Sequence, residues 1–98
     1  MIVSFRYSWL QTFFEDNVFT SRVPADIKNR VFRKLQILDD ATTDNDLRSP
    51  PGNHFERLRG NLTGWHSIRV NKRWRLVFRW DGALGEASEV YLDDHSYS

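Results

Sequence analysis

The feature that most constrains the fold is a run in which apolar and basic residues alternate. Large apolar side chains fall at every second position of this run: Trp74, Leu76, Phe78 and Trp80. The positions between them hold Arg75, Val77 and Arg79. A period of two is typical of a β-strand that buries one face and exposes the other. We therefore predict a strand over residues 74–80, with Trp74, Phe78 and Trp80 in the core.

Further segments with the same period predict partners for this strand. Residues 65–71 place His66, Ile68 and Val70 on one face, and the turn Asn71–Arg73 connects them to the strand over 74–80. Phe55 and Leu58 mark a short strand before Gly60, and Val90 and Leu92 mark the last strand. Strands that follow one another with short connections favour an antiparallel meander.

The first half of the chain predicts helices. After a short apolar strand over Met1–Phe5, Ser8 and Gln11 have the spacing of a capping box for a helix that ends near Asp16. Pro24 suits the first turn of a second helix, which should end near Asp40. Its apolar residues recur at helical spacing: Ile27, Val31, Leu35 and Leu38. Residues 41–53 are expected to form a loop, because Pro50, Pro51 and Gly52 interrupt regular structure.

These elements predict an α+β fold with two N-terminal helices packed on one face of a small, mainly antiparallel sheet. The 98 residues suit one domain, over residues 1–98. No apolar run approaches the ~20 residues of a membrane span, so we expect no membrane partner. The absence of cysteine excludes a disulfide, and together with only three histidines it argues against structural zinc.

Charge is strongly segregated along the chain although the net charge is only +1. Residues 48–79 contain eight Lys and Arg residues but one acid, Glu56, whereas residues 80–98 contain five acids and no Lys or Arg. Alternation predicts that Arg69, Arg75 and Arg79 share one exposed face of the sheet, which Arg57 and Arg59 extend if their strand pairs alongside. A solvated polar face remains possible, but it usually mixes signs of charge. A cluster with so few acids favours a polyanion such as nucleic acid.

Several motifs resemble the HigB toxins of the RelE/ParE superfamily over nearly the whole chain. They are PPGN at 50–53, LRGNLTGWHSIRVNKRWRLVFRW at 58–80 and VYLDDH at 90–95. The resemblance implies two helices on a small curved sheet and cleavage of mRNA in the ribosomal A site without a metal or cofactor. It also implies a HigA-type antitoxin as partner and contact with operator DNA only through that antitoxin, while the absence of cysteine fits a reducing, cytoplasmic location.

The resemblance also assigns site residues. The expected catalytic residues are Arg59, Arg75, Asp93 and His95. The resemblance adds Arg69 as an RNA contact, and the basic surface and its surroundings supply the other expected RNA-binding residues: Arg57, Lys72, Arg73, Arg79, His54 and Trp65. This chain departs from its relatives in two places: Asp94 stands where many carry tyrosine, and Glu56 stands where some carry histidine.

Histidine, glutamate and tryptophan side chains in this region could each serve structure instead of function. His95 suits acid–base chemistry because its ordinary pKa lies near neutrality, but it could also be an exposed tail histidine. For Glu56 we favour a surface carboxylate paired with a nearby arginine over a general base. His54 is left open, and His66 is expected to be a core or half-buried residue. Trp65 could equally stack on a base or pack in the protein.

Two other functions compete with RNA cleavage. A ParE-like inhibitor of DNA gyrase would have the same fold and basic hairpin, but its site lacks acid–base groups, so Asp93 and His95 favour the nuclease. A simple RNA- or operator-binding module is less favoured, because no helix-turn-helix or aromatic RNA-recognition signature is found.

Overall fold

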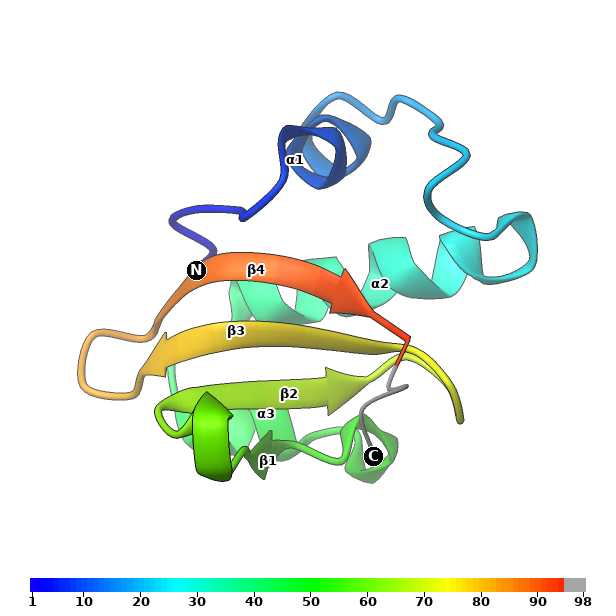
Figure 1. Ribbon diagram of the computed structural model, residues 1–98. Helices are drawn as coiled ribbons and strands as arrows, with labels where there is room; N and C mark the ends of the chain where they lie inside the picture. Colours follow the sequence, from blue (N-terminus) through cyan, green and yellow to red (C-terminus); the bar gives the residue numbers. More distant parts are fainter. Residues whose placement is uncertain (95–98) are drawn as a thin grey trace.

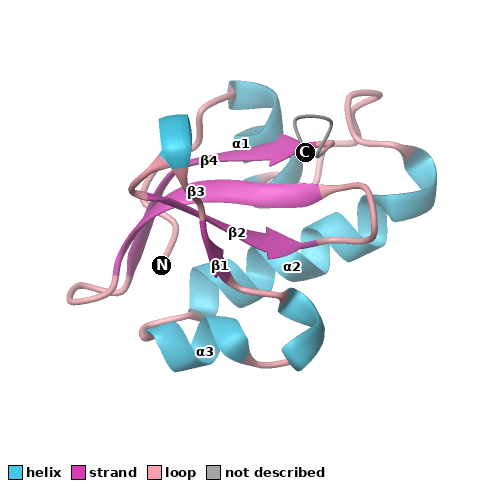
Figure 2. Cartoon of the chain, turned by 60° about the horizontal axis from the view of Figure 1, so that its bottom comes forward, coloured by secondary structure: helices cyan, strands magenta, loops and turns pink. Residues whose placement is uncertain are grey.

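The computed structural model describes residues 1–94, so His95, one of the predicted catalytic residues, lies outside the described residues. Helices pack on one face of a four-stranded sheet of order β1-β2-β3-β4, which confirms the α+β fold class (Figures 1 and 2). The helices and strands are α1 (Ser8–Glu15), α2 (Lys28–Asp40), α3 (Asp44–Arg48), β1 (Glu56–Arg57), β2 (Trp65–Arg69), β3 (Arg75–Asp81) and β4 (Glu86–Asp93). Short 3-10 turns occupy Ala25–Ile27, Pro51–Asn53 and Gly60–Leu62. Within residues 1–94, no helix has the length and apolar character that crossing a membrane requires.

The four strands form the predicted antiparallel meander. In the β2–β3 pair, His66 lies opposite Phe78 and Ile68 opposite Leu76, while Arg69 lies opposite Arg75. Partners across a strand pair point to the same side of the sheet. The sheet therefore has an apolar face toward α2 and an opposite face that carries the arginines, which we call the outer face.

The N-terminal segment joins the sheet as an irregular fifth member. Its backbone pairs in parallel with β4 at two isolated positions, Ile2 with Ala87 and Phe5 with Val90. The predicted strand over Met1–Phe5 is thus extended and paired, but it does not form a regular strand. The sheet is consequently mainly, not wholly, antiparallel.

A β-bulge in β4 interrupts this pairing. Because Val77 pairs with Tyr91 and Arg79 with Ser88, two residues of β4, Glu89 and Val90, lie opposite Phe78. Glu89 adopts a left-handed backbone with a φ of 53°, and its N–H donates to the Ser4 hydroxyl at 2.9 Å. The extra residue shifts the alternation by one position, so Ala87 and Val90 are both buried.

The two predicted N-terminal helices are present, but the capping box at Ser8 is wrong. Ser8 is already the first residue of α1, and Tyr7 before it makes no side-chain capping hydrogen bond. Gln11 instead donates to Glu15 one turn later, at 3.2 Å. The second predicted helix is divided into the 3-10 turn Ala25–Ile27 and α2.

The prediction that residues 41–53 are a loop is wrong at α3. The capping box of this helix is complete, because the Thr43 hydroxyl accepts the N–H of Asp46 while the Asp46 carboxylate accepts the N–H of Thr43. Leu47 is fully buried and anchors the short helix to the core. The fully buried Asn53 fixes the following turn, since its amide donates to the carbonyl oxygens of Leu47 and Ser49 at 3.1 and 3.3 Å.

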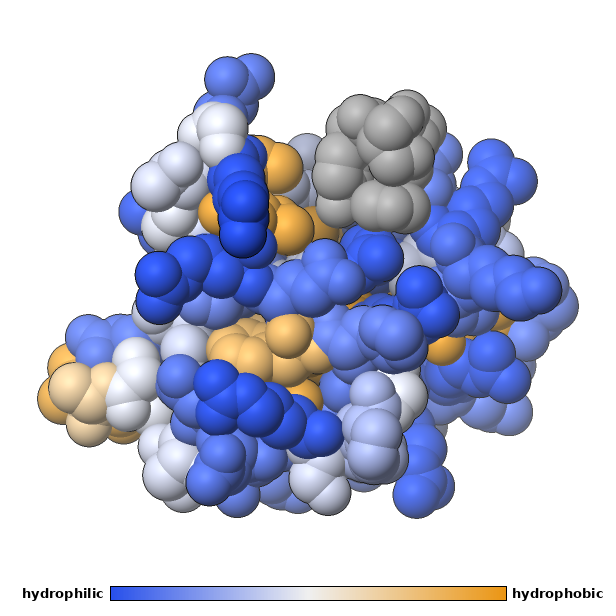
Figure 3. Space-filling model, turned by 90° about the horizontal axis from the view of Figure 1, so that it is seen from below, coloured by the Kyte–Doolittle hydropathy of each residue, from blue (hydrophilic) through white to orange (hydrophobic). Residues whose placement is uncertain are grey.

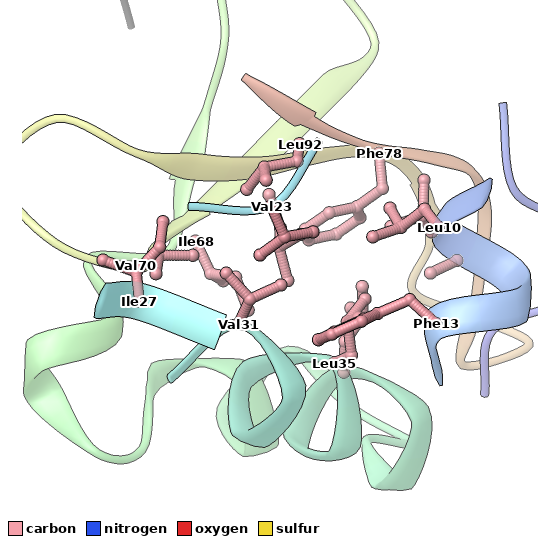
Figure 4. Packing of buried hydrophobic residues seen from close by; sticks show 14 of the residues in the cluster. Leu10, Phe13, Val23, Ile27, Val31, Leu35, Ile68, Val70, Phe78 and Leu92 are labelled. Carbon is pink, nitrogen blue, oxygen red and sulfur yellow. The ribbon is translucent and has the colours of Figure 1, made fainter. Parts of the chain in front are cut away.

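The core lies between the helices and the apolar face of the sheet (Figure 4). Leu10 and Phe13 come from α1, and Val31 and Leu35 come from α2. The sheet contributes Ile68, Leu76, Phe78 and Val90, with Trp74 and Trp80 partly buried against them. The predicted core face is therefore confirmed, and it holds the sheet as a rigid support for the outer face.

Candidate active site on the outer face of the sheet

Arg75 is the most constrained cation of the outer face. The residue is only 7% exposed, and its Nη1 donates to the Ser67 hydroxyl at 3.4 Å. The same nitrogen lies 3.8 Å from the Glu56 carboxylate, which confirms the expectation that Glu56 pairs with an arginine. Arg69 and Asp93 lie beside Arg75 on the neighbouring strands. The sheet thus fixes one guanidinium group in a polar and largely buried setting.

The acidic end of the chain returns to this basic region. Asp93, the last residue of β4, is the cross-strand partner of Arg75, and Asp94 forms an ion pair with Arg73 at 3.8 Å. The segregation of charge along the sequence is therefore partly neutralised in the fold. Two of the predicted catalytic residues, Arg75 and Asp93, are brought together by the strand register.

A second group of cations surrounds the turn between β2 and β3. Arg69, Lys72 and Arg73 line an open hollow together with Arg30 of α2. Asn71 shapes the turn, because its side-chain oxygen accepts the backbone N–H groups of Arg73 and Trp74 at 2.8 and 2.7 Å. Arg30 falls on the polar side of the predicted helix, but nothing in the sequence indicates that this side borders the turn. Seen from below, hydrophilic side chains cover most of the surface (Figure 3).

Arg69 adds an unusual feature to this group. Its Nε atom is buried without a hydrogen-bond partner among the described residues. A buried donor without a partner costs free energy, and each one calls for a specific explanation, such as a bound ion. Arg69 Nε is therefore an unsatisfied donor on the strand next to Arg75, within the part of the chain that the structure describes.

A third group lies at the other end of the outer face, around Trp65. Trp65 is 7% exposed and packs edge-on against Tyr91, with 5.9 Å between ring centroids. The guanidinium groups of Arg6 and Arg79 lie 5.0 and 4.8 Å from the Trp65 ring centroid. The sequence left open whether Trp65 stacks on an RNA base or packs inside the protein. In the structure Trp65 packs inside the protein. Arg6 was missed, because its proximity depends on parallel pairing with the last strand.

The remaining predicted residues are less closely associated with Arg75. Arg57 pairs with His66, so it points to the helix side, and the expectation that it extends the outer face is wrong. Arg59 is exposed and follows Leu58, whose N–H donates to the Trp65 carbonyl, at the end of the face remote from Arg75. The exposed His54 precedes β1, and antiparallel pairing directs it toward the Arg69 end of β2.

His66 lies on the helix side of the sheet, as predicted. Its ring stacks on Phe55 and Phe78, with centroid separations of 5.3 and 6.5 Å. Burial, with a smaller effect from Arg57, lowers the pKa of His66 below its ordinary value. His66 is therefore a structural residue that the fold keeps neutral.

Replacing His66 with phenylalanine is expected to reduce the loss of stability on acidification. The unfolded histidine titrates near its ordinary value of about 6.5, and the folded one titrates lower. The unfolded state therefore binds more protons between these two values, so the contribution to stability is complete above about pH 6.5 and falls as the pH decreases through this window. Urea unfolding between about pH 5 and 8 measures the effect. His54→Gln is the matched control, and equal pH slopes for wild type and His66→Phe would contradict the assignment.

Comparisons with known proteins show the family and the fold to which the chain is similar. A family model described as the RelE-like toxin of the type II toxin-antitoxin system HigB matches residues 3–95. The chain is 52% identical over 97 residues to Toxin HigB-1 of Vibrio cholerae, covering 99% of this chain and 100% of that protein. It is 36% identical to Endoribonuclease HigB of Proteus vulgaris over 95 residues, covering 97% and 99%. A YoeB/ParE toxin structure from Agrobacterium tumefaciens has the same fold, with a TM-score of 0.51 and 23% identity over 96% of each chain.

Proposed function

The chain belongs to the family of RelE-like HigB toxins of type II toxin–antitoxin systems, and on this premise we propose that it is a ribosome-dependent endoribonuclease. The single observation that carries the proposal is the fixed guanidinium of Arg75, 3.4 Å from the Ser67 hydroxyl and beside Asp93 and Arg69. The name of the Proteus vulgaris relative, Endoribonuclease HigB, supports the same activity.

The proposed reaction uses the 2′-hydroxyl of the substrate RNA as nucleophile. A base removes its proton, the oxygen attacks the adjacent phosphorus, and an acid protonates the 5′-oxygen as the P–O bond breaks. The products are a 2′,3′-cyclic phosphate and a 5′-hydroxyl. Negative charge develops on the phosphate oxygens in the transition state, and prearranged donors aimed at them lower the barrier. No step of this reaction requires a metal ion or another cofactor.

Arg75 is the proposed donor to the phosphate oxygens, and Arg69 is its neighbour on β2. A planar guanidinium can bind two phosphate oxygens at once, and its burial strengthens the interaction. Glu56 and Ser67 position Arg75, because both contact its Nη1. Asp93 and His95 are the proposed acid–base pair, and His54 approaches from the opposite strand edge. Arg59, at the remote end of the face, is proposed to contact the RNA farther along the strand.

The family also specifies a partner, since a type II toxin is paired with a protein antitoxin. We propose that this partner is a HigA-type antitoxin. The toxin contacts operator DNA only through that antitoxin. The substrate is mRNA in the ribosomal A site, and the site of action is the cytoplasm. The cations at the β2–β3 turn, including Arg30, Lys72 and Arg73, are suited to ribosomal RNA because phosphate contacts need charge more than fixed geometry.

The proposal is tested by inducing the chain in growing bacteria and mapping the 5′ ends of an abundant mRNA by primer extension. We expect new cuts inside the reading frame, and a mutated start codon in that mRNA should abolish them because translation is required. A His95→Ala sample determines whether His95 takes part in proton transfer. Arrested growth with intact mRNA and broken DNA would contradict the proposal and favour a gyrase inhibitor instead.

A further inference from the structure

The third group of cations, around the rings of Trp65 and Tyr91, is distinct from the Arg75 centre and lies at the other end of the outer face. Arg6 lies over Tyr91, with 3.9 Å between its guanidinium carbon and the ring centroid, and 5.0 Å from Trp65. Arg79 lies 4.8 Å from the centroid of the same Trp65 ring. Four separate segments of the chain therefore bring two arginines onto one pair of aromatic rings.

The rings hold both guanidinium groups in place, while Arg79 Nε also pairs with Glu89 and Arg6 also makes a side-chain hydrogen bond to Tyr91. A guanidinium that lies over an aromatic ring keeps its N–H groups directed outward in its own plane. Arg6 is exposed, and the Arg79 side chain is 53% exposed, whereas Trp65 is buried. Two cations fixed in this way lose little conformational freedom when they bind an anion.

Arg79 also has an internal anion that occupies it in the free protein. Its Nε lies 3.2 Å from the Glu89 carboxylate, and both side chains are about half exposed. Glu89 reaches this position from the bulge, in a left-handed backbone conformation with a φ of 53°. An exposed ion pair of this kind is weak, so a phosphate group can replace the carboxylate.

The position of this site relates it to the Arg75 centre. Arg79 is four residues after Arg75 on β3 and shares its face of the sheet, which corresponds to about 13 Å. A single strand that places one phosphate at Arg75 and continues along β3 would reach Arg79 and Arg6. The distance suits an extended strand of a few nucleotides rather than one small anion.

We infer that Arg6 and Arg79 form a second RNA-backbone site, supported by Trp65 and Tyr91, which holds the single strand next to the nucleotide bound at Arg75. Glu89 competes with the RNA phosphate at Arg79. This inference rests on the proposed function for its substrate class, single-stranded RNA. It assigns Arg6, Tyr91 and Glu89 to RNA binding, and it makes Trp65 a support for arginines rather than a surface for bases.

The test measures the affinity of the purified protein for a fluorescently labelled single-stranded RNA of eight nucleotides across a series of salt concentrations. Arg6→Ala is expected to lower the affinity at low salt about tenfold and to reduce the salt slope by about 0.7, the value for one lost phosphate contact on a single strand. Arg6→Lys should retain the slope because it retains the charge. Glu89→Gln should raise the affinity about two- to fivefold.

Lys28→Ala is the matched control, because Lys28 is also an exposed cation over a ring, 5.2 Å from the Phe19 centroid, but it lies in the helical layer. Melting temperatures confirm that each variant is folded. Equal affinities and slopes for Arg6→Ala and Lys28→Ala would overturn the inference, as would a wild-type protein without RNA affinity at low salt. If binding depends on Arg6 but the wild type cuts no mRNA during translation, the RNA site stands and the proposed nuclease function fails.

Discussion

Replacing Arg75 with alanine is expected to reduce mRNA cleavage by about 10²–10³-fold, the usual effect of removing one donor that stabilises a transition-state charge. Arg75 is 7% exposed and fixed by Ser67 and Glu56, so water cannot easily replace its guanidinium. Arg75→Lys should recover only part of the activity, because an ammonium group cannot bind two phosphate oxygens in one plane. The rate is measured by primer extension on ribosome-bound mRNA with purified protein.

Arg73→Ala provides the matched control for this experiment. Arg73 is two residues away on the same hairpin, but its side chain is 72% exposed and pairs with Asp94 at 3.8 Å. Its loss should weaken binding to the ribosome and leave the rate at saturating protein nearly unchanged. Equal rates at saturation for the Arg75→Ala variant and the wild type, with both proteins folded, would remove Arg75 from the chemistry.

Replacing Gly85 with alanine is expected to destabilise the fold by about 2–5 kcal/mol. Gly85 has a φ of 67°, and a Cβ atom there would lie 2.5 Å from the Thr42 carbonyl oxygen. Both the left-handed backbone and the collision oppose the substitution, and the colliding group is backbone that cannot rotate away. Urea unfolding monitored by tryptophan fluorescence gives the change in the free energy of unfolding.

Gly60→Ala separates the cost of the left-handed backbone from the cost of the collision with Thr42. Gly60 has nearly the same φ, 66°, but a Cβ atom there would have no neighbour within 4 Å. Its replacement should cost about 1–2 kcal/mol from the backbone conformation alone. Equal destabilisation at Gly60 and Gly85 would show that the contact with Thr42 relaxes without cost.

The sequence predicted those parts of the fold in which one element has one buried face. The period of two in β3 and the helical spacing of Val31, Leu35 and Leu38 identified the sheet and α2, because burial of one side enforces a period. The short α3 was missed, since five residues are too few to show a period and its stability comes from the Thr43–Asp46 capping box and the burial of Leu47.

The sequence predicted which residue types make up the candidate site better than it predicted where each residue lies. Arg75 and Asp93 were predicted, and the register places them opposite each other. Arg57 was assigned to the wrong side, because a two-residue strand has no period and a shift of one residue reverses its faces. Arg6 could not be found, since its position depends on pairing with a strand more than 80 residues away in the sequence.

The pairing of the N-terminal segment with β4 also determines when, during translation, the sheet can be completed. Ile2 and Phe5 find their partners, Ala87 and Val90, only when the last strand has been made. The same strand supplies Asp93, opposite Arg75, and Tyr91, beneath Arg6. A nascent chain therefore has neither a closed sheet nor an assembled outer face until residues 86–93 have left the ribosome that translates them. A protein proposed to attack ribosome-bound mRNA therefore lacks its own site as long as residues 86–93 are still inside the ribosome that makes them.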